Sequence, residues 1–178
     1  MPAVTESIYA PPEADIEVRD NADGNYYVVA PGKFLALTIL TLGLYFVYWF
    51  YRHWRSVKDR AESSIWPVPR GIFYIFFTHS LFSDINERLR DRGDDYAWSP
   101  GTSATLVVIA SILSNVLGRA AGENIGSPIT DIASLAIVPV LAYLALPAQK
   151  AANLASGDAN GSSNASFTGA NWVWMILG

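Results

Sequence analysis

The sequence predicts an all-α membrane protein with three, or alternatively four, transmembrane helices and one short interfacial or re-entrant amphipathic helix. Residues 34–51 are eighteen residues without a charge, and a helix of that length covers about 27 Å, close to the thickness of a bilayer's hydrocarbon core. Only 16% of the chain is charged, against about 25% in soluble domains. The charges gather in the N-terminal tail and between Arg52 and Asp95, which leaves long stretches almost free of them.

Residues 1–24 are predicted to be a disordered acidic tail. They combine proline with aspartate and glutamate and have no lasting periodicity, so they bury too little apolar surface to offset the entropy of ordering. The tail lacks the basic-then-apolar arrangement of a signal peptide. A helical membrane domain is expected over residues 25–154.

The first predicted span covers about 34–51, and two more follow at about 102–117 and 129–146. The second has no charge and is preceded by Pro100-Gly101, a helix-start signal. The third contains Asp131 and Pro139, and a proline inside a helix is tolerated in membranes when neighbours satisfy the freed carbonyl.

Residues 68–91 are predicted to form an interfacial or re-entrant helix. Their apolar part, residues 71–82, is too short to span, and an apolar stripe then continues through Ile85 and Leu89 beside charged positions. The alternative is a fourth span that begins earlier, at residue 65, which would bring Arg70 and two prolines into the membrane.

Lysine and arginine counts predict the orientation. With three spans, the loop of residues 52–101 holds eight basic residues and the opposite side holds three, Arg19, Lys33 and Arg119. The bias places loop 52–101 in the cytoplasm and the N-terminal tail outside. It weakens if residues 68–91 cross, because three arginines then change sides.

Aromatic and basic residues crowd the end of the first predicted span. They are predicted to anchor it at the membrane interface, because amphipathic rings favour the headgroup region and arginines meet anionic lipids. Packing of the rings against neighbouring helices is an equally good interpretation, and both can hold. The candidate anchors are Tyr48, Trp49, Arg52, Trp54 and Arg55.

Several short motifs resemble those of a family of uncharacterised bacterial multi-pass inner-membrane proteins, a domain of unknown function. The motifs are Lys33-Phe34, TLGLY at 41–45, YWFY at 48–51 with Trp54, Pro67 with RGIF at 70–73, FF at 76–77 and LF at 81–82, followed more loosely by Gly157-Asp158, Asn164, Phe167-Thr168 and Asn171. The resemblance implies a multi-pass protein of the bacterial inner membrane. It implies no activity and no catalytic or binding residue.

Ionisable residues in membrane segments are candidate functional residues because their burial is costly. His79, Asp84 and Asp131 are the candidates here. His79 is either a proton relay or metal ligand, or a polar residue on an interfacial helix face. Asp131 is expected to cap its helix, where a carboxylate is favoured by the exposed amides. The charges between Asp84 and Asp95 are either general acid–base groups or a solvated helix end.

One pattern along the second predicted span indicates helix packing. Small residues recur every four positions and let another helix approach closely, either the third span or another copy. They are Ala110, Ser114, Gly118 and Gly122. After the third span, residues 155–178 are expected to be a flexible tail, rich in glycine, serine and asparagine, with an apolar end too short to span.

The sequence favours a non-catalytic scaffold or accessory subunit of the bacterial inner membrane. It contains no cysteine and no HExxH, GxSxG or phosphate-binding loop motif, so neither an enzyme nor a cofactor is predicted. The net charge of −4 argues against nucleic acid. The expected partners are the lipid bilayer and another membrane protein or a second copy. The alternative is a small oligomeric transporter or channel with a polar path near His79, Asp84 and Asp131.

Overall fold

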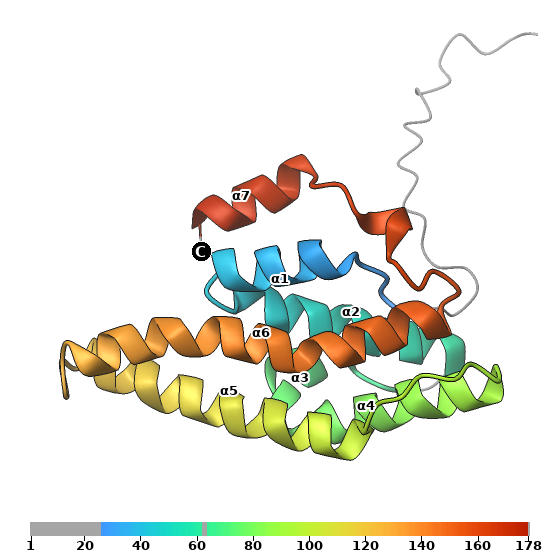
Figure 1. The fold of residues 1–178 in the computed structure, drawn as a ribbon, viewed down its shortest axis with the longest axis horizontal. Helices are drawn as coiled ribbons and strands as arrows, with labels where there is room; N and C mark the ends of the chain where they lie inside the picture. The colour runs from blue at the N-terminus through green and yellow to red at the C-terminus, as the bar shows by residue number, and fades with distance from the viewer. Residues whose placement is uncertain (1–25, 62–63, 178) are drawn as a thin grey trace, which may run out of the picture.

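The computed structural model describes residues 26–61 and 64–177, and this part of the chain is helical without a strand (Figure 1). An extended segment, residues 26–30, precedes the first helix. The elements are α1 (Pro31–Leu40), α2 (Leu44–Ala61), α3 (Pro67–Ile72), α4 (Tyr74–Asp91), α5 (Pro100–Gly122), α6 (Ile129–Ala155), the 3₁₀ turn η1 (Ser162–Asn164) and α7 (Gly169–Leu177). The predicted acidic tail lies outside the described residues.

The prediction of one continuous helix over residues 34–51 is wrong, because the chain turns between α1 and α2. Leu42 and Gly43 have φ angles of 48° and 90°, in the left-handed region that ends helices. The Gly43 N–H donates to the Thr38 carbonyl at 2.8 Å, and the Tyr45 N–H donates to the Thr41 hydroxyl at 3.0 Å. The uncharged run therefore forms a short helical hairpin rather than a span.

Helices α2, α4 and α6 enclose an aromatic core with α1. The ring of Phe34 on α1 lies 5.6 Å from that of Trp49 on α2, which in turn lies 4.8 Å from Phe50. Helix α3 packs unusually close to α2 at Gly71, where a Cβ would lie 2.9 Å from the Tyr51 Cβ and 3.0 Å from the Val47 carbonyl oxygen. Only glycine fits that contact.

The helix predicted over residues 68–91 is present, divided at Phe73 into α3 and α4. Its predicted apolar stripe is confirmed, since α4 buries Leu81, Ile85 and Leu89 against the body. The charged positions beside that stripe remain at the surface or in ion pairs.

Helices α5 and α6 form a long antiparallel hairpin whose connecting loop protrudes from the body (Figure 1). They include the predicted spans 102–117 and 129–146, and both are long and apolar enough to cross a membrane by length and composition. Their buried residues lie near the body: in the first half of α5, from Ala104 to Ser111, and in α6 from Val138 onward.

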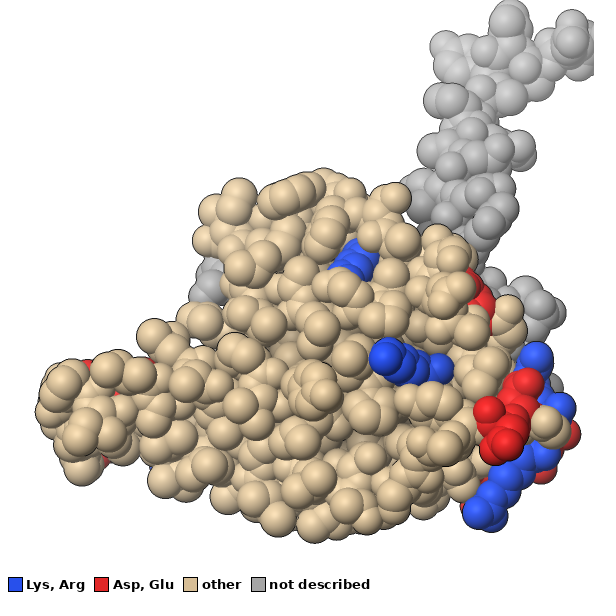
Figure 2. Space-filling model, viewed as in Figure 1, with Lys and Arg blue, Asp and Glu red and all other residues tan. Residues whose placement is uncertain are grey.

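Charge is separated along the long axis of the molecule. On the face seen in Figure 2, lysines, arginines and acids gather at the end where α4 finishes, while the surface toward the α5–α6 loop is nearly uncharged. At the charged end Arg92 pairs with Asp94 at 3.0 Å. The charged end of the molecule therefore suits water, and the nearly uncharged end suits an apolar environment.

The segment after α6 is folded, in contrast to the flexible tail that its composition predicts. The Asp158 carboxylate accepts the N–H groups of Ser162 and Ser163 at 2.9 and 2.8 Å and starts the η1 turn. These backbone hydrogen bonds lower the pKa of Asp158. Beyond the turn, α7 lies over α1 (Figure 1).

The start of the described chain lies beside the charged end. The hydroxyl of Tyr26 donates to Asp84 on α4 at 2.5 Å, and its backbone N–H donates to the Ser156 hydroxyl at 3.0 Å. The prediction that the N-terminal tail and loop 52–101 lie on opposite sides of a membrane depends on one crossing helix over 34–51. Because that segment is a helical hairpin, the basis for this separation is lost.

Candidate functional site: a cationic pocket beneath α7

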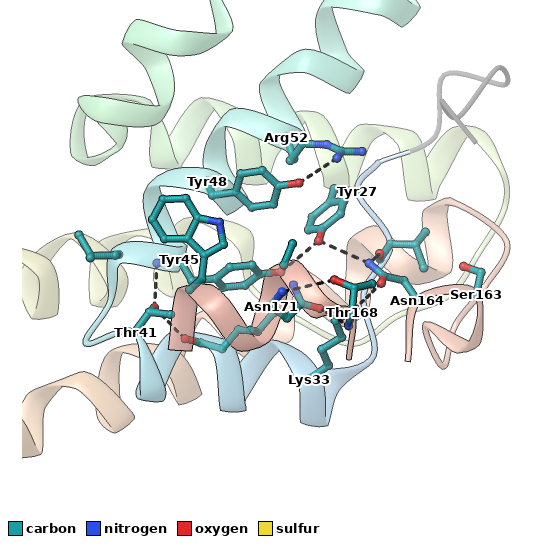
Figure 3. Close-up of a pocket in the computed structure, with 15 residues that line it drawn as sticks. Tyr27, Lys33, Thr41, Tyr45, Tyr48, Arg52, Ser163, Asn164, Thr168 and Asn171 are labelled. Atoms are coloured by element: carbon teal, nitrogen blue, oxygen red, sulfur yellow. Dashed lines mark hydrogen bonds between the residues drawn. The ribbon is translucent and has the colours of Figure 1, made fainter. Parts of the chain in front are cut away.

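A cavity of about 590 Å³ lies between the α1–α2 hairpin and the C-terminal segment, within the usual size range of ligand sites (Figure 3). We call it the α7 pocket. Its wall consists of Tyr27, Val28, Lys33, Leu37, Thr41, Leu44, Tyr45, Tyr48, Arg52, Ser163, Asn164, Thr168, Ala170, Asn171 and Trp174. These residues come from both ends of the chain, so the site exists only in the folded protein.

Lys33 is a buried cation in the wall of the pocket. Its ammonium donates to the Asn164 side-chain oxygen at 2.6 Å and to the Ser166 carbonyl at 2.7 Å, and only 4% of the residue is exposed. Both partners are neutral, so no carboxylate balances the charge. Burial lowers the pKa of Lys33 for that reason.

Arg52, the second cation of the pocket, is held by tyrosines. Its guanidinium donates to the Tyr48 hydroxyl at 2.9 Å and lies 4.8 Å above the centre of the Tyr27 ring (Figure 3). Such a contact between a cation and an aromatic face fixes the guanidinium without neutralising it. Neither Arg52 nor Lys33 has a carboxylate partner within the described part of the chain, and no acidic residue lines the pocket.

The pocket becomes apolar toward the α1–α2 turn. Lys33 lies near the start of α1 and Thr41 follows its end, about 12 Å farther along the helix. In the hairpin, Leu44 at the start of α2 therefore lies at the end of the pocket opposite Lys33. Leu44, Leu37 and Trp174 supply apolar surface, so the cavity has one cationic and one apolar end.

A buried amide pair on α6 holds the extended segment that forms one wall. The Asn153 side chain accepts the Val29 N–H at 3.2 Å and donates to the Val29 carbonyl at 2.9 Å, as a neighbouring strand would. Gln149 donates to Asn153 at 2.6 Å and to the Tyr27 carbonyl at 3.1 Å, and accepts the Trp49 indole N–H. The amide pair satisfies backbone groups that would otherwise be buried without partners.

His53 lies behind this wall and is fully buried. Neither ring nitrogen has a hydrogen-bond partner in the described part of the chain, and the ring lies 4.4 Å from that of Trp49. Burial, reinforced by the nearby charge of Arg52, lowers the pKa of His53 to about 3. His53 is therefore neutral at physiological pH and is packed as a core residue.

None of the three predicted polar residues lines the α7 pocket. Asp84 accepts hydrogen bonds from Arg60 at 2.6 Å and from Tyr26, and so joins α2, α4 and the extended segment. Burial, followed by the charge of Asp84, raises the pKa of Tyr26. Exposed His79 contacts the Thr105 hydroxyl at 3.1 Å across the α4–α5 packing.

Asp131 lies in the first turn of α6, next to the loop that protrudes from the body. It accepts a hydrogen bond from the Ser127 hydroxyl at 2.5 Å rather than from the α6 backbone, so its expected capping contact is replaced by a side-chain one. The polar path that a transporter would need beside His79, Asp84 and Asp131 stays a prediction.

The predicted interface anchors divide into core and surface residues. Trp49 and Trp54 are buried in the aromatic core, which agrees with the alternative that the rings pack against neighbouring helices. Trp49 packs against Phe34 of α1, and Trp54 packs against Phe77 of α4 and Arg70 of α3. Tyr48 is 43% exposed and Arg55 pairs with Asp59 at 3.8 Å, while Arg52 belongs to the pocket.

The predicted small-residue stripe packs inside the fold only at its start. Ala110 is buried and Ser114 is half-buried against the α5–α6 contact. A Cβ added to Gly118 or Gly122 would meet nothing within 4 Å. The second half of the stripe is therefore open to the surroundings.

No group of three or more metal-ligating side chains lies together among the residues that the structure places. Comparison of the chain with protein-family models, curated proteins and solved structures finds no match. The site must therefore be interpreted from its own chemistry.

The sequence singles out Tyr48 and Arg52 as interface anchors and not as parts of a pocket. Lys33 and Asn164 stand only in motifs, and Gln149 and Asn153 are ordinary polar positions at the end of an apolar helix. Only the i, i+4 spacing of two amides on an otherwise apolar helix could have drawn attention to that pair.

Proposed function

We propose that the chain is a non-catalytic membrane protein of the bacterial inner membrane, anchored by the α5–α6 hairpin, that acts as a scaffold or accessory subunit for another membrane protein. The single observation that supports this is the apolar surface of the hairpin. Ile112, Val116, Ile132 and Leu135 are each at least half exposed, which is costly in water and ordinary in lipid.

The distribution of charge supports an orientation for this anchor. Arg119 is the only lysine or arginine between residues 102 and 149, whereas the body carries the rest of the basic residues on the described chain. Under the positive-inside rule the body lies in the cytoplasm and the α5–α6 loop outside. In this proposal the protein has two spans, α5 and α6, and not the three expected from hydropathy. The start of α5 and the end of α6 both lie on the cytoplasmic side.

The non-catalytic part of the proposal is supported by the surroundings of two titratable side chains. His53 is sealed in the core, and Asp84 is paired with Arg60. An exposed apolar surface remains on α3 and α4, where Phe73 and Phe76 are 58% and 78% exposed. Together with the open half of the small-residue stripe, it offers contact area for a partner.

The proposal is tested by crosslinking and affinity purification of the tagged full-length chain from its native membrane. We expect one membrane protein to be recovered reproducibly. Gly118→Leu should reduce that recovery because it fills the open stripe, and Gly101→Leu, which also enters open space, is the matched control. Recovery of the chain alone from crosslinked membranes would contradict the scaffold function.

A further inference from the structure

The α7 pocket holds two cations and no acidic side chain among the residues that the structure describes. Lys33 is buried against neutral amide and carbonyl oxygens, and Arg52 lies against tyrosines. Buried charges in proteins are normally paired, because an isolated charge loses its hydration. Among the described residues this counter-charge is missing, and an anionic ligand would supply it.

A tyrosine adds a neutral donor to the cationic end. The Tyr27 hydroxyl oxygen lies 3.4 Å from both the Tyr45 hydroxyl and the Asn164 side-chain nitrogen, each of which can donate to it. Its own proton then has no acceptor among the described residues and is available to a ligand in the cavity (Figure 3). Hydrogen bonds to an anion are the strong ones, so this donor favours a phosphate or carboxylate.

The opposite end of the pocket excludes a small anion as the whole ligand. The wall there includes Leu44 beside Thr41, Leu37 and Trp174 add apolar surface, and about 590 Å³ is far more space than one inorganic anion fills. Apolar walls favour an apolar chain, because its transfer from water releases free energy in proportion to the area buried. The ligand therefore has a charged head and an apolar tail.

The exit from the apolar end leads to lipid, a point that depends on the proposed membrane anchor. Leu40, Leu42 and Leu44 are each more than half exposed at the α1–α2 turn. This turn points toward the same end of the molecule as the α5–α6 loop (Figure 1). A tail longer than the pocket would leave it on the side that the hairpin places in the membrane.

We propose that the α7 pocket binds an anionic amphiphile, with its phosphate or carboxylate at the Lys33 and Arg52 end and its apolar chain along α1 toward Leu44 and Trp174. Two sources share this chemistry, an anionic phospholipid of the bilayer and a free fatty anion. Helix α7 covers the bound chain.

Native mass spectrometry of the full-length protein in a neutral maltoside detergent tests the proposal. The probes are dioctanoyl-phosphatidylglycerol, its zwitterionic phosphatidylcholine counterpart, decanoate and inorganic phosphate. We expect phosphatidylglycerol, decanoate or both to bind at least about tenfold more tightly than phosphatidylcholine and phosphate. Phosphatidylglycerol alone assigns the ligand to the bilayer, and decanoate alone assigns it to free fatty anions.

Matched variants locate the binding. Arg52→Gln should weaken it about tenfold or more, whereas Arg55→Gln, one turn farther along α2 and outside the pocket, should not. Ala170→Trp fills the cavity from α7 without changing a charge and should also weaken binding. Melting curves of each variant report its folding.

Three results would overturn the proposal. The first is that phosphatidylglycerol and phosphatidylcholine bind equally and decanoate does not bind. The second is that phosphate binds as tightly as the amphiphiles. The third is that Arg52→Gln and Arg55→Gln change binding equally. None of them bears on the membrane anchor, which is tested separately by labelling.

Discussion

Asn153→Leu should destabilise the protein by more than about 3 kcal/mol, because it removes the clamp on the extended segment. Leucine has a similar volume but leaves the Val29 N–H, the Val29 carbonyl and one Gln149 amide proton buried without partners. Each such group costs about 1–3 kcal/mol. The segment that forms one wall of the α7 pocket would then separate from α6.

Denaturant unfolding in detergent measures this loss. Asn160→Leu is the control, because Asn160 is exposed after α6 and its replacement should change the free energy of unfolding by less than about 0.5 kcal/mol. Equal stability of the two variants would show that Asn153 does not hold the segment.

Gly161→Ala should be the most damaging change in the C-terminal segment. Gly161 has a φ of +67°, and a Cβ there would lie 2.5 Å from the Ala30 nitrogen and from the Val29 carbonyl carbon and oxygen. Backbone atoms cannot move aside as a flexible side chain does, so the η1 turn must separate from residues 29 and 30. Strain of about 1–2 kcal/mol and overpacking of about 1–3 kcal/mol add to a loss of several kcal/mol.

This separation also removes the partners of Lys33, since Asn164 is the last residue of the turn and Ser166 follows two positions later. Hydrogen exchange at the Ala30 amide, which donates to the Asn164 carbonyl at 3.3 Å, should become faster. Gly169→Ala is the control: a Cβ at that position meets nothing within 4 Å, and alanine favours the helix. Slow exchange at Ala30 in Gly161→Ala would contradict the predicted contact.

The helical class and the two apolar helices of the hairpin could be predicted from the sequence, because long uncharged runs determine them directly. The α1–α2 turn could not. Residues 41–44 are as uncharged as their surroundings, and Gly43 is the one local signal of a turn. Glycine is also common inside transmembrane helices, so an uncharged run of sufficient length predicts a span even where it contains one.

The site could not be predicted because its contacts join distant parts of the chain. Lys33 meets Asn164, and Tyr27 meets Gln149, across more than a hundred residues. Taken singly, each of these polar residues would be expected at the protein surface. Only the fold shows that Lys33 is buried without a carboxylate.

The central claim is that α5 and α6 cross the membrane as a hairpin while the body stays on one side. The chain contains no cysteine, so single cysteines can be labelled without background. In intact spheroplasts an impermeant maleimide should label Glu123→Cys, between the two helices, and should reach Glu87→Cys on α4 only after permeabilisation. Labelling of both positions from the same side would contradict the hairpin anchor.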